Sequence, residues 1–482
     1  MVRVDRTHSL HAASGTPSMI VQRKQETAAG REPCQTDLGG RGAVLQRVFD
    51  TQILKRATFA LIFFWRLSDR SAALQPRLHS RVRYINMLRN FPMALEPQSR
   101  AENAALPRAA HSRTTRPLRV AQLSTLYERV PPNFYGGAER GISYLTEELV
   151  RRGHEVTLFA SGDSVTSAKL VSGFPRSLRL AGLSVPAVGP GLHLPMLAEA
   201  YGNAHNFDVI HSHVDFWCFP FARLNSTPTV VTMHGRLDVK ESKLVYERFS
   251  DIPLVSLSQA QRAQLPMMNW LGSVYQGLPR DLLKFNPHPG SYLAFLGRIS
   301  PEKRVDIAIE VALRVGIPLK IAAKVDAVDS EYFDTVIKPK LCPPSVEYVG
   351  EIAEHEKNEF LGNAIALLFT IGWPEPFGLA MVEALACGVP VVACPYGSVL
   401  EVVRDGETGF IGSTVEELVA AVKRIDKLSR ASCRAEFDGR FTSSHMALRY
   451  EQIYLDLIRA REDKLGLRVA HTNGVAQKNP AP

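Results

Sequence analysis

The chain has 482 residues, of which 45% are hydrophobic, so it is long enough for two or three domains with sizeable cores. The formal net charge is +9, but it is concentrated in residues 1–116, which hold 19 lysines and arginines against 8 acidic residues. The rest of the chain holds 38 basic and 40 acidic residues. The basic character therefore belongs to the first 116 residues and gives no reason to expect nucleic-acid binding by the folded body.

The six cysteines are widely spaced, and none forms a Cys-x-x-Cys pair. This spacing argues against a zinc site or a disulfide framework and favours a reducing compartment. The longest apolar run, at 57–65, is about half the length that a bilayer span needs. We therefore expect a cytoplasmic protein without a transmembrane helix, compatible with peripheral contact at a membrane.

Residues 1–116 form a basic N-terminal extension with little periodicity, and 96–117 has the composition of a linker. Three hypotheses account for it: a disordered segment, upstream sequence that is not translated (with Met87 or Met93 as the true start), or an organellar transit peptide. Four acidic residues among the first 37 argue against a transit peptide, which is poor in acids. We predict that the extension is disordered and that the rest of the chain folds without it.

A regular pattern begins at Leu118. A short apolar strand at 118–125, a glycine-containing loop, an amphipathic helix at 138–153 that stops at Gly153, and a strand at 155–161 form a βαβ unit. Such a unit implies parallel strands and a right-handed crossover. Apolar stretches typical of further buried strands lie at 208–213, 227–235, 253–258 and 272–277. We assign 117–286 to a first Rossmann-like domain.

A second series of the same kind begins at Tyr292. We expect strands at 292–297, 318–324, 346–350, 365–370 and 390–395, and helices at 304–316, 355–364 and 377–388. This series defines a second domain, 287–445, with a hinge around 281–291, a final amphipathic helix assigned to 446–462 (its periodic part is 446–460), and a tail at 463–482. The predicted fold class is α/β, with two doubly wound domains facing a central cleft.

The stretch 372–393, GWPEPFGLAMVEALACGVPVVA, contains two acids that stand eight residues apart, Glu375 before a predicted helix and Glu383 within it. If most of the interval is helical, about 12 Å of rise separates them, more than the about 5–9.5 Å of a glycosidase pair. Two acids at opposite ends of one long ligand fit this spacing better. The alternative is a solvated helix acid and a simple turn.

Two cations follow a strand in FLGRISPEKRVD (295–306), where Arg298 and Lys303 lie in a predicted loop before a helix. The carboxyl ends of strands in an open α/β domain face the binding crevice. Arginine, as a planar fork, and lysine, as a point charge, suit a diphosphate there. Ordinary surface charge is the alternative.

Two weaker signals lie in the first domain. YGGAER (135–140) contains paired glycines that permit close approach of a phosphate or sugar, although it is not the G-x-G-x-x-G fingerprint. His234 ends a predicted strand and is either a cleft residue or a structural one. His211 and His213 share one face of a strand, but no third ligand stands nearby in the sequence, and the chain has no Asp-x-Asp motif. We therefore predict no metal.

Together these stretches, with VEYVGE (346–351) and GSVLEVVRDGETGF (397–410), resemble the retaining glycosyltransferases of family 4, which have the GT-B fold. The resemblance runs from about Leu118 to Ile458 in the family's order. Leu400 and Thr370 depart from residues common in the family, at positions that carry no chemistry. Residues 1–116 have no counterpart.

The resemblance implies roles for individual residues. Arg298 and Lys303 would hold the donor diphosphate, Glu383 the ribose hydroxyls and Glu375 the transferred sugar. His234 would contact the donor sugar from the first domain. The other donor-binding positions that the resemblance implies are Gly136, Gly137, Gly350, Glu351, Phe377, Gly378 and Leu379.

The resemblance further implies transfer of a hexose from a nucleotide-diphosphate sugar, UDP-glucose or GDP-mannose, to a glycan or lipid-linked acceptor, without cofactor or metal. The nucleotide base is expected near Gly350 and Glu351. A sugar-nucleotide epimerase and a non-catalytic sugar-nucleotide-binding protein are the alternatives on the same fold. The epimerase would need further acid/base carboxylates in the cleft. The oligomeric state stays open.

Overall fold

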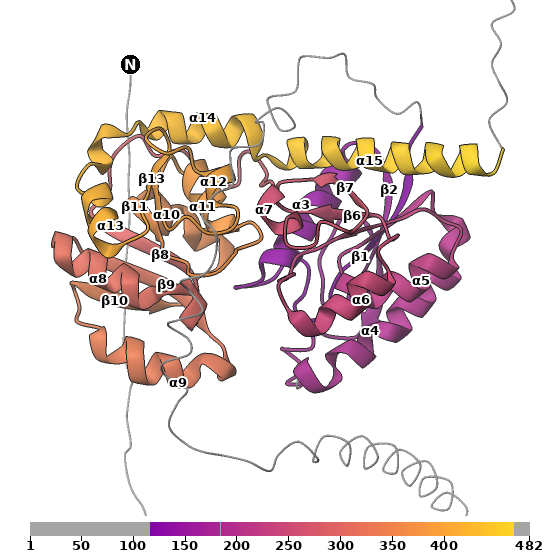
Figure 1. Cartoon of the computed structure of the whole chain (residues 1–482), viewed down its shortest axis with the longest axis horizontal. Helices are drawn as coiled ribbons and strands as arrows, with labels where there is room; N and C mark the ends of the chain where they lie inside the picture. Colours follow the sequence, from indigo (N-terminus) through magenta and orange to yellow (C-terminus); the bar gives the residue numbers. More distant parts are fainter. Residues whose placement is uncertain (1–115, 184, 467–482) are drawn as a thin grey trace, which may run out of the picture. The chain divides into compact units, whose positions relative to one another are not determined.

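Two parallel β-sheets, each with helices packed on it, make up the described part of the chain (Figure 1). The computed structural model describes residues 116–183 and 185–466. The predictions for the basic extension (all but Arg116) and for the tail beyond 466 lie outside the described residues. The predicted fold class, two doubly wound α/β domains, is confirmed.

The first sheet has seven strands in the order β3-β2-β1-β4-β5-β6-β7, all parallel. The strands are β1 (Arg119–Leu123), β2 (Glu155–Ser161), β3 (Lys169–Phe174), β4 (Val209–Ser212), β5 (Thr229–Thr232), β6 (Leu254–Ser256) and β7 (Trp270–Ser273). The helices of this part are α3 (Gly137–Arg151), α4 (Val185–Gly202), α5 (Phe219–Leu224), α6 (Lys243–Arg248) and α7 (Gln259–Arg262).

The second sheet has six parallel strands in the order β10-β9-β8-β11-β12-β13. They are β8 (Tyr292–Ile299), β9 (Leu319–Val325), β10 (Val346–Gly350), β11 (Ala364–Phe369), β12 (Val391–Ala393) and β13 (Gly409–Ile411). The helices are α8 (Val305–Val315), α9 (Ser330–Tyr332), α10 (Lys357–Gly362), α11 (Leu379–Ala386), α12 (Val399–Val402), α13 (Val415–Val422), α14 (Arg430–Arg440) and α15 (Ser443–Lys464).

The strand orders locate the site before any side chain is considered. In each sheet the first strand of the series, β1 or β8, is central, and the chain builds outward first on one side and then on the other. The order reverses beside that strand, so the loops after it and its neighbours diverge and leave a crevice at the carboxyl ends. The segments that follow β1 and β8 are those that carry the glycine pair and the two predicted cations.

Local sequence explains the ends of some elements. Helix α8 stops at Gly316, whose φ of 71° is left-handed and whose N–H is donated to the Ala312 carbonyl. Helix α13 starts at Thr414, which forms a capping box with Glu417. Strands β4 and β5 are buried along their whole length, as expected of strands covered on both faces.

The sequence analysis did not predict several elements, among them strands β3 and β13 and helices α13 and α14. Three further differences have a local explanation or bear on the site. Helix α4 was not predicted, because Pro190 and Pro195 lie inside it and proline disfavours a helix interior. Strand β8 continues through Arg298, whereas the sequence predicts a loop at this residue. Helix α11 starts only at Leu379, because Gly378 before it has a left-handed φ of 78°. The four residue steps from Leu379 to Glu383 are therefore helical, about 6 Å of rise, and the four steps from Glu375 to Leu379 are not helical, so the spacing of the two acids is not that of a single helix.

The chain passes between the domains twice, and the two passages touch. Leu278 in the first passage donates its N–H to the Phe441 carbonyl and accepts the N–H of Ser443 in the second. A Cβ on Gly277 would lie 2.2 Å from the Thr442 carbonyl oxygen, so the close approach requires glycine here.

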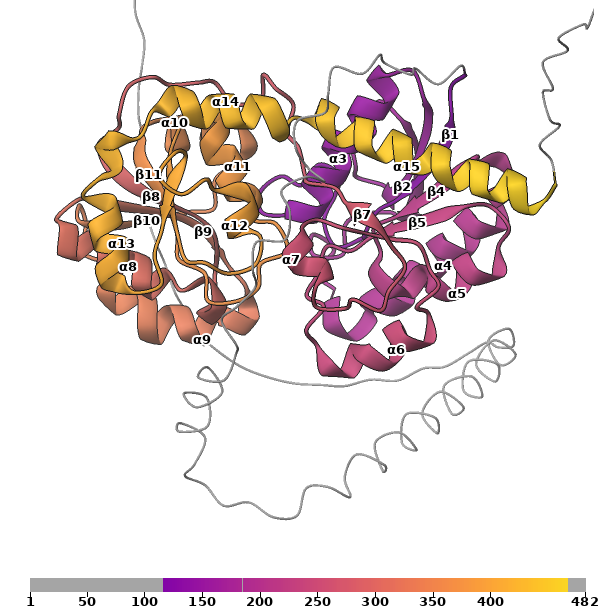
Figure 2. The same ribbon diagram turned by 45° about the horizontal axis from the view of Figure 1, so that its top comes forward.

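Helix α15 follows the second passage and lies along the first domain, where it contacts α3 and β4 (Figure 2). Tyr450 and Tyr454 are its buried aromatic residues. Glu451 receives hydrogen bonds from Arg152 (2.5 and 2.7 Å) and from His154 (2.8 Å). The C-terminal helix is thus held on the first domain by apolar packing and by one charged cluster. Among the described helices, none is long and apolar enough to cross a membrane.

Replacing Glu451 by Gln should lower the free energy of unfolding at pH 7 by about 1.5–3 kcal/mol, the contribution of hydrogen bonds to a charged group. Burial acts to raise the pKa of Glu451, but the bonds from His154 and Arg152 outweigh it and lower the pKa from 4.5 to about 2. The stabilisation is therefore complete above pH 4.5 and is lost as the pH falls toward 2.

Urea unfolding of the wild type and of Glu451→Gln between pH 7 and pH 3 measures this difference. Asp456→Asn is the matched control, because Asp456 is an exposed acid on the same helix paired with Arg459. It should change stability little. A difference between Glu451→Gln and the wild type that stays constant down to pH 3 would contradict the assigned contacts.

Candidate active site

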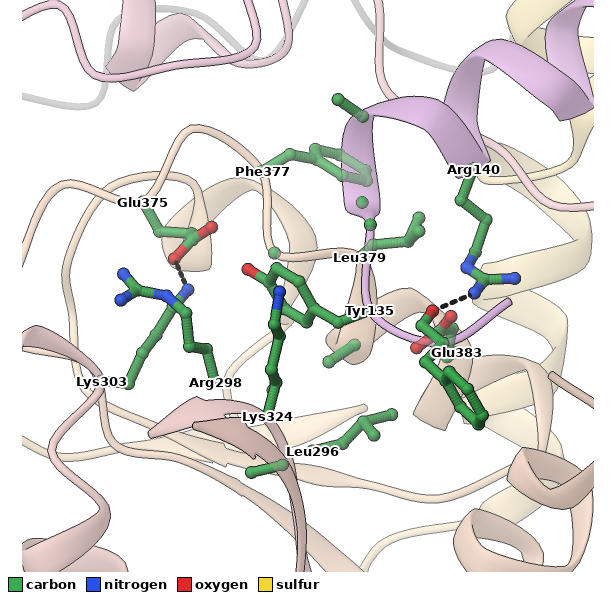
Figure 3. Close-up of a pocket in the computed structure, with 18 of the residues that line it drawn as sticks. Tyr135, Arg140, Leu296, Arg298, Lys303, Lys324, Glu375, Phe377, Leu379 and Glu383 are labelled. Carbon is green, nitrogen blue, oxygen red and sulfur yellow. Dashed lines mark hydrogen bonds and ion pairs between the residues drawn. The ribbon is translucent and has the colours of Figure 1, made fainter. Parts of the chain in front are cut away.

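A cleft of about 360 Å³ lies between the two domains and is lined by residues of both (Figure 3). The first domain contributes the loop after β1, the start of α3 and His234. The second contributes the ends of β8 and β9, the segment around Glu351 and the loop before α11. Every residue that the sequence analysis proposed for donor binding or catalysis lines this cleft, except Gly350.

The glycine pair opens the cleft on the side of the first domain. A Cβ on Gly136 would lie 2.8 Å from the ring carbons of Pro132, whereas a Cβ on Gly137 would meet nothing within 4 Å. Gly136 is therefore needed for packing, and Gly137 leaves backbone accessible to a ligand. The buried Arg140 side chain holds this loop by donating to the Phe134 carbonyl at 2.6 Å.

The two predicted cations are both paired with carboxylates. Lys303 forms an ion pair with Glu375, which Figure 3 shows at one end of the cleft. Burial acts to lower the pKa of Lys303, but Glu375 outweighs it and the net shift is upward. Arg298 pairs with Glu302 and Asp329. Both side chains are therefore charged and held in place without a ligand.

Glu383 lies away from that pair in the same cleft (Figure 3). Its carboxylate is almost fully buried and accepts from Lys357 Nζ at 2.5 Å. Lys357 also contacts Glu354 at 3.2 Å, and Glu354 pairs with Arg140 of the first domain. A chain of alternating charges thus runs from α3 across the cleft to Glu383, which compensates the burial of each charge.

The remaining predicted residues have structural roles that fit their positions. Phe377 is buried, so that only its backbone is available to a ligand. Gly378 lies close to Phe369, since a Cβ there would be 2.7 Å from its ring. Glu351 is exposed at the cleft and accepts the N–H of Tyr135 at 3.5 Å. Gly350 has a left-handed φ of 82° and turns the chain before Glu351, but it does not line the cleft.

His234 is the end of a buried hydrogen-bond chain. His213 lies 2.8 Å from the Gln122 side-chain carbonyl, which can only accept, so His213 Nε2 donates. Its Nδ1 then accepts from His234 Nε2 at 2.9 Å, which leaves His234 Nδ1 as an acceptor. Gln122 continues the chain to Tyr454 of α15 at 3.2 Å.

Burial keeps these imidazoles neutral. It lowers the pKa of His234 to about 4, and it lowers the pKa of His213 and of His211 well below the ordinary value of histidine. His211 bonds to Tyr454 (2.7 Å) and to Thr232 (2.7 Å), so it is occupied structurally. Within the described residues no three His, Cys, Asp or Glu side chains form a group that could hold a metal ion.

Several residues that line the cleft are not among those predicted from the sequence. Glu139 in YGGAER is buried, its pKa is raised by that burial, and it bonds to Thr125. Lys324 could have been found, because it ends the predicted strand 318–324, at the same carboxyl edge of the sheet as Arg298, which follows the predicted strand 292–297. Lys357 could not, because only the tertiary fold brings it to Glu383.

Comparisons with known families and proteins agree with this architecture. The model for Glycosyltransferase Family 4 matches residues 135–273, and the model for Glycosyl transferases group 1 matches residues 284–436. The two matches cover the two domains in turn.

Two relatives illustrate the sequence similarity. The chain is 25% identical to a phosphatidyl-myo-inositol mannosyltransferase of Propionibacterium freudenreichii, over 58% of this chain and 78% of that protein. It is also 25% identical to a D-inositol 3-phosphate glycosyltransferase of Mycolicibacterium smegmatis, over 64% of this chain and 84% of that protein.

Solved structures share the fold. Sucrose-phosphate synthase from Thermosynechococcus elongatus matches with a TM-score of 0.61 at 17% identity, over 71% of this chain and 100% of that one. Anabaena HepE in complex with UDP and glucose matches with a TM-score of 0.56 at 17% identity, over 70% of this chain and 100% of that one.

The neutral histidine chain predicts a pH dependence. Unfolded histidine binds a proton near pH 6.5, whereas folded His234 does so near pH 4. The unfolded state therefore binds more protons between these values, and stability should fall as the pH drops through that window. His234→Asn should reduce the slope of unfolding free energy against pH by up to about 1.4 kcal/mol per pH unit.

Urea unfolding at pH 7, 6 and 5 tests this expectation. His205→Asn is the control, since His205 is exposed and should leave the slope unchanged. If the two variants have the same slope, His234 has an ordinary histidine pKa in the folded protein. The prediction that the buried histidines are neutral would then be wrong.

Proposed function

This chain is a glycosyltransferase of the GT-B fold that belongs to family 4, and we propose that it transfers a hexose, with retention of configuration, from a nucleotide-diphosphate sugar. The observation that carries the proposal is the convergence of Arg298, Lys303, Glu375 and Glu383 on one cleft. The two cations and Glu375 lie together, and Glu383 lies apart from them. A ligand with an anionic centre between two hydroxyl-rich ends fits this distribution.

In the proposed orientation the ribose lies at Glu383 and the sugar at Glu375, with the diphosphate against Arg298 and Lys303. Glu383 is suited to hydroxyl groups, because Lys357 holds its carboxylate in place as an acceptor. The backbone at Gly137 approaches the diphosphate from the first domain, and the base lies by Glu351. His234 offers Nδ1 as an acceptor to a hydroxyl of the sugar.

We propose that the acceptor oxygen attacks the anomeric carbon on the face that the diphosphate leaves. The bond from that carbon to the diphosphate oxygen breaks, the new glycosidic bond forms, and the acceptor proton passes to the leaving oxygen. Arg298 and Lys303 stabilise the charge that develops on the diphosphate, as preorganised groups held by their carboxylate partners. Glu375 orients the sugar rather than attacking it, because its carboxylate is engaged by Lys303.

The donor and acceptor are proposed by class. The solved complex of HepE with UDP and glucose supports a uridine donor such as UDP-glucose, and the mannosyltransferase relative supports GDP-mannose as the second candidate. The names of the relatives point to a polyol or lipid-linked acceptor. We propose a glycan or lipid-linked acceptor used in the cytoplasm, compatible with peripheral contact at a membrane.

Glu375→Gln and Glu383→Gln should fail in different ways. Loss of the Glu383 carboxylate removes a contact to the unreactive ribose, so affinity for UDP or GDP should fall about tenfold to a hundredfold. Loss of the Glu375 carboxylate should lower kcat by a similar factor, because the sugar loses its orientation. Affinity for UDP or GDP should be retained or increased in Glu375→Gln. The Glu375 carboxylate competes with the diphosphate group for Lys303, and this variant removes it.

Calorimetric titration with UDP and GDP, beside steady-state kinetics, measures both effects. Glu359→Gln is the matched control, since Glu359 is an exposed acid on neighbouring α10. Equal loss of nucleotide affinity in Glu375→Gln and Glu383→Gln would overturn the proposed orientation. Wild-type kinetics in both would overturn the site.

Turnover should not require a divalent cation, because Arg298 and Lys303 supply the positive charge at the diphosphate. The rate in the presence of excess EDTA should equal the rate without it. Activity that EDTA abolishes, and that Mg²⁺ or Mn²⁺ restores, would show that these side chains are not sufficient.

A further inference from the structure

A third cation lies beside the two that the sequence analysis identified. Strands β8 and β9 are parallel neighbours, and Arg298 is the registered partner of Lys324. Registered partners on adjacent strands project to the same face of the sheet. Lys324 therefore stands next to Arg298 at the carboxyl ends of the two strands, and both line the cleft (Figure 3).

Lys324 also lies between the two ends of the proposed ligand. In Figure 3 its side chain stands between the Lys303–Glu375 pair and Glu383, close to Tyr135. Its ammonium group is 5.9 Å from the centre of the Tyr135 ring. The proposed diphosphate occupies the same interval, because the sugar and the ribose lie at the two ends.

The charge of Arg298 is already strongly offset. Three carboxylates lie within ion-pair distance of its guanidinium group, those of Glu302, Asp326 and Asp329. Lys303 is paired with Glu375. A diphosphate that met only these two cations would also meet the field of their acids, so a further positive charge would favour its binding.

The Lys324 ammonium group can move away from its present partners without leaving either of them without a cation. It contacts Asp326 at 2.9 Å and Glu128 at 4.0 Å. Asp326 has a second cation in Arg298 at 3.9 Å, and Glu128 has one in Arg179 at 2.8 Å. Moving the Lys324 ammonium group toward a ligand therefore leaves neither carboxylate unpaired.

We propose that Lys324 is a third diphosphate-binding residue, whose ammonium group contacts the donor diphosphate and stabilises the charge it gains when the bond to the sugar breaks. The inference rests on the proposed function, since it takes the ligand to be a nucleotide-diphosphate sugar. Lys324 forms and breaks no covalent bond in the proposed transfer. The group that Lys324 recognises is the diphosphate, not the base or the ribose.

The test is calorimetric binding of uridine, UMP and UDP, and of the guanosine series, to the full-length protein and to Lys324→Met. Methionine keeps much of the side-chain length and removes the charge. Affinity for the diphosphate should fall about tenfold to a hundredfold, affinity for the nucleoside should not change, and kcat/KM with the sugar nucleotide should fall at least as much. Lys324→Arg should restore most of the loss.

Lys320→Met is the matched control, because Lys320 lies on the same strand, is 40% exposed and pairs with Glu347 outside the cleft. It should bind all three ligands as the wild type does. Unchanged diphosphate affinity in Lys324→Met, or an equal loss for nucleoside and diphosphate, would overturn the inference. If the wild type binds neither UDP nor GDP, the proposed function is wrong. The role of Lys324 is then wrong as well, because it assumes a nucleotide-diphosphate ligand.

Discussion

Lys303, Glu375, Lys357 and Glu383 of the cleft are each held in an ion pair, and this pairing is the constraint on which the site depends. Lys303 is held by Glu375, and Lys357 by Glu383 and Glu354. A buried charge without a partner costs several kcal/mol, so a site that carries this many ionised groups can fold only if they neutralise one another. A ligand must then exchange partners with these pairs rather than fill an empty positive pocket. The affinity for a ligand is therefore the difference between its contacts with these side chains and the ion pairs that it replaces. Such a site favours ligands whose charges are arranged to replace those pairs.

The fold could be predicted from the sequence because its signals are local. Alternating apolar strands and amphipathic helices define both domains, and glycine marks helix ends such as the one at Gly316. The prediction failed where a local rule was overruled. Helix α4 forms around two prolines, and Gly378 delays the start of α11, so that only part of the segment between Glu375 and Glu383 is helical.

The site could be predicted only in part, for a reason of the same kind. Residues that end a strand or begin a helix can be placed in a crevice from topology alone, as Arg298 and Glu375 were. The partners of those residues come from other elements. Neither the Lys357 contact to Glu383 nor the Tyr454 contact to Gln122 has a sequence signal, because each joins segments brought together only by the tertiary fold.

The two passages between the domains form a single mechanical element. Since Leu278 is hydrogen-bonded to Phe441 and Ser443, the passages cannot bend independently. Two separate linkers would let the domains twist, slide and open in several directions. Two linkers joined by hydrogen bonds must move together as long as those bonds are kept, so the domains have fewer independent ways to shift against each other. The same joint therefore limits how far the groups that opposite domains contribute to the cleft can be displaced from one another.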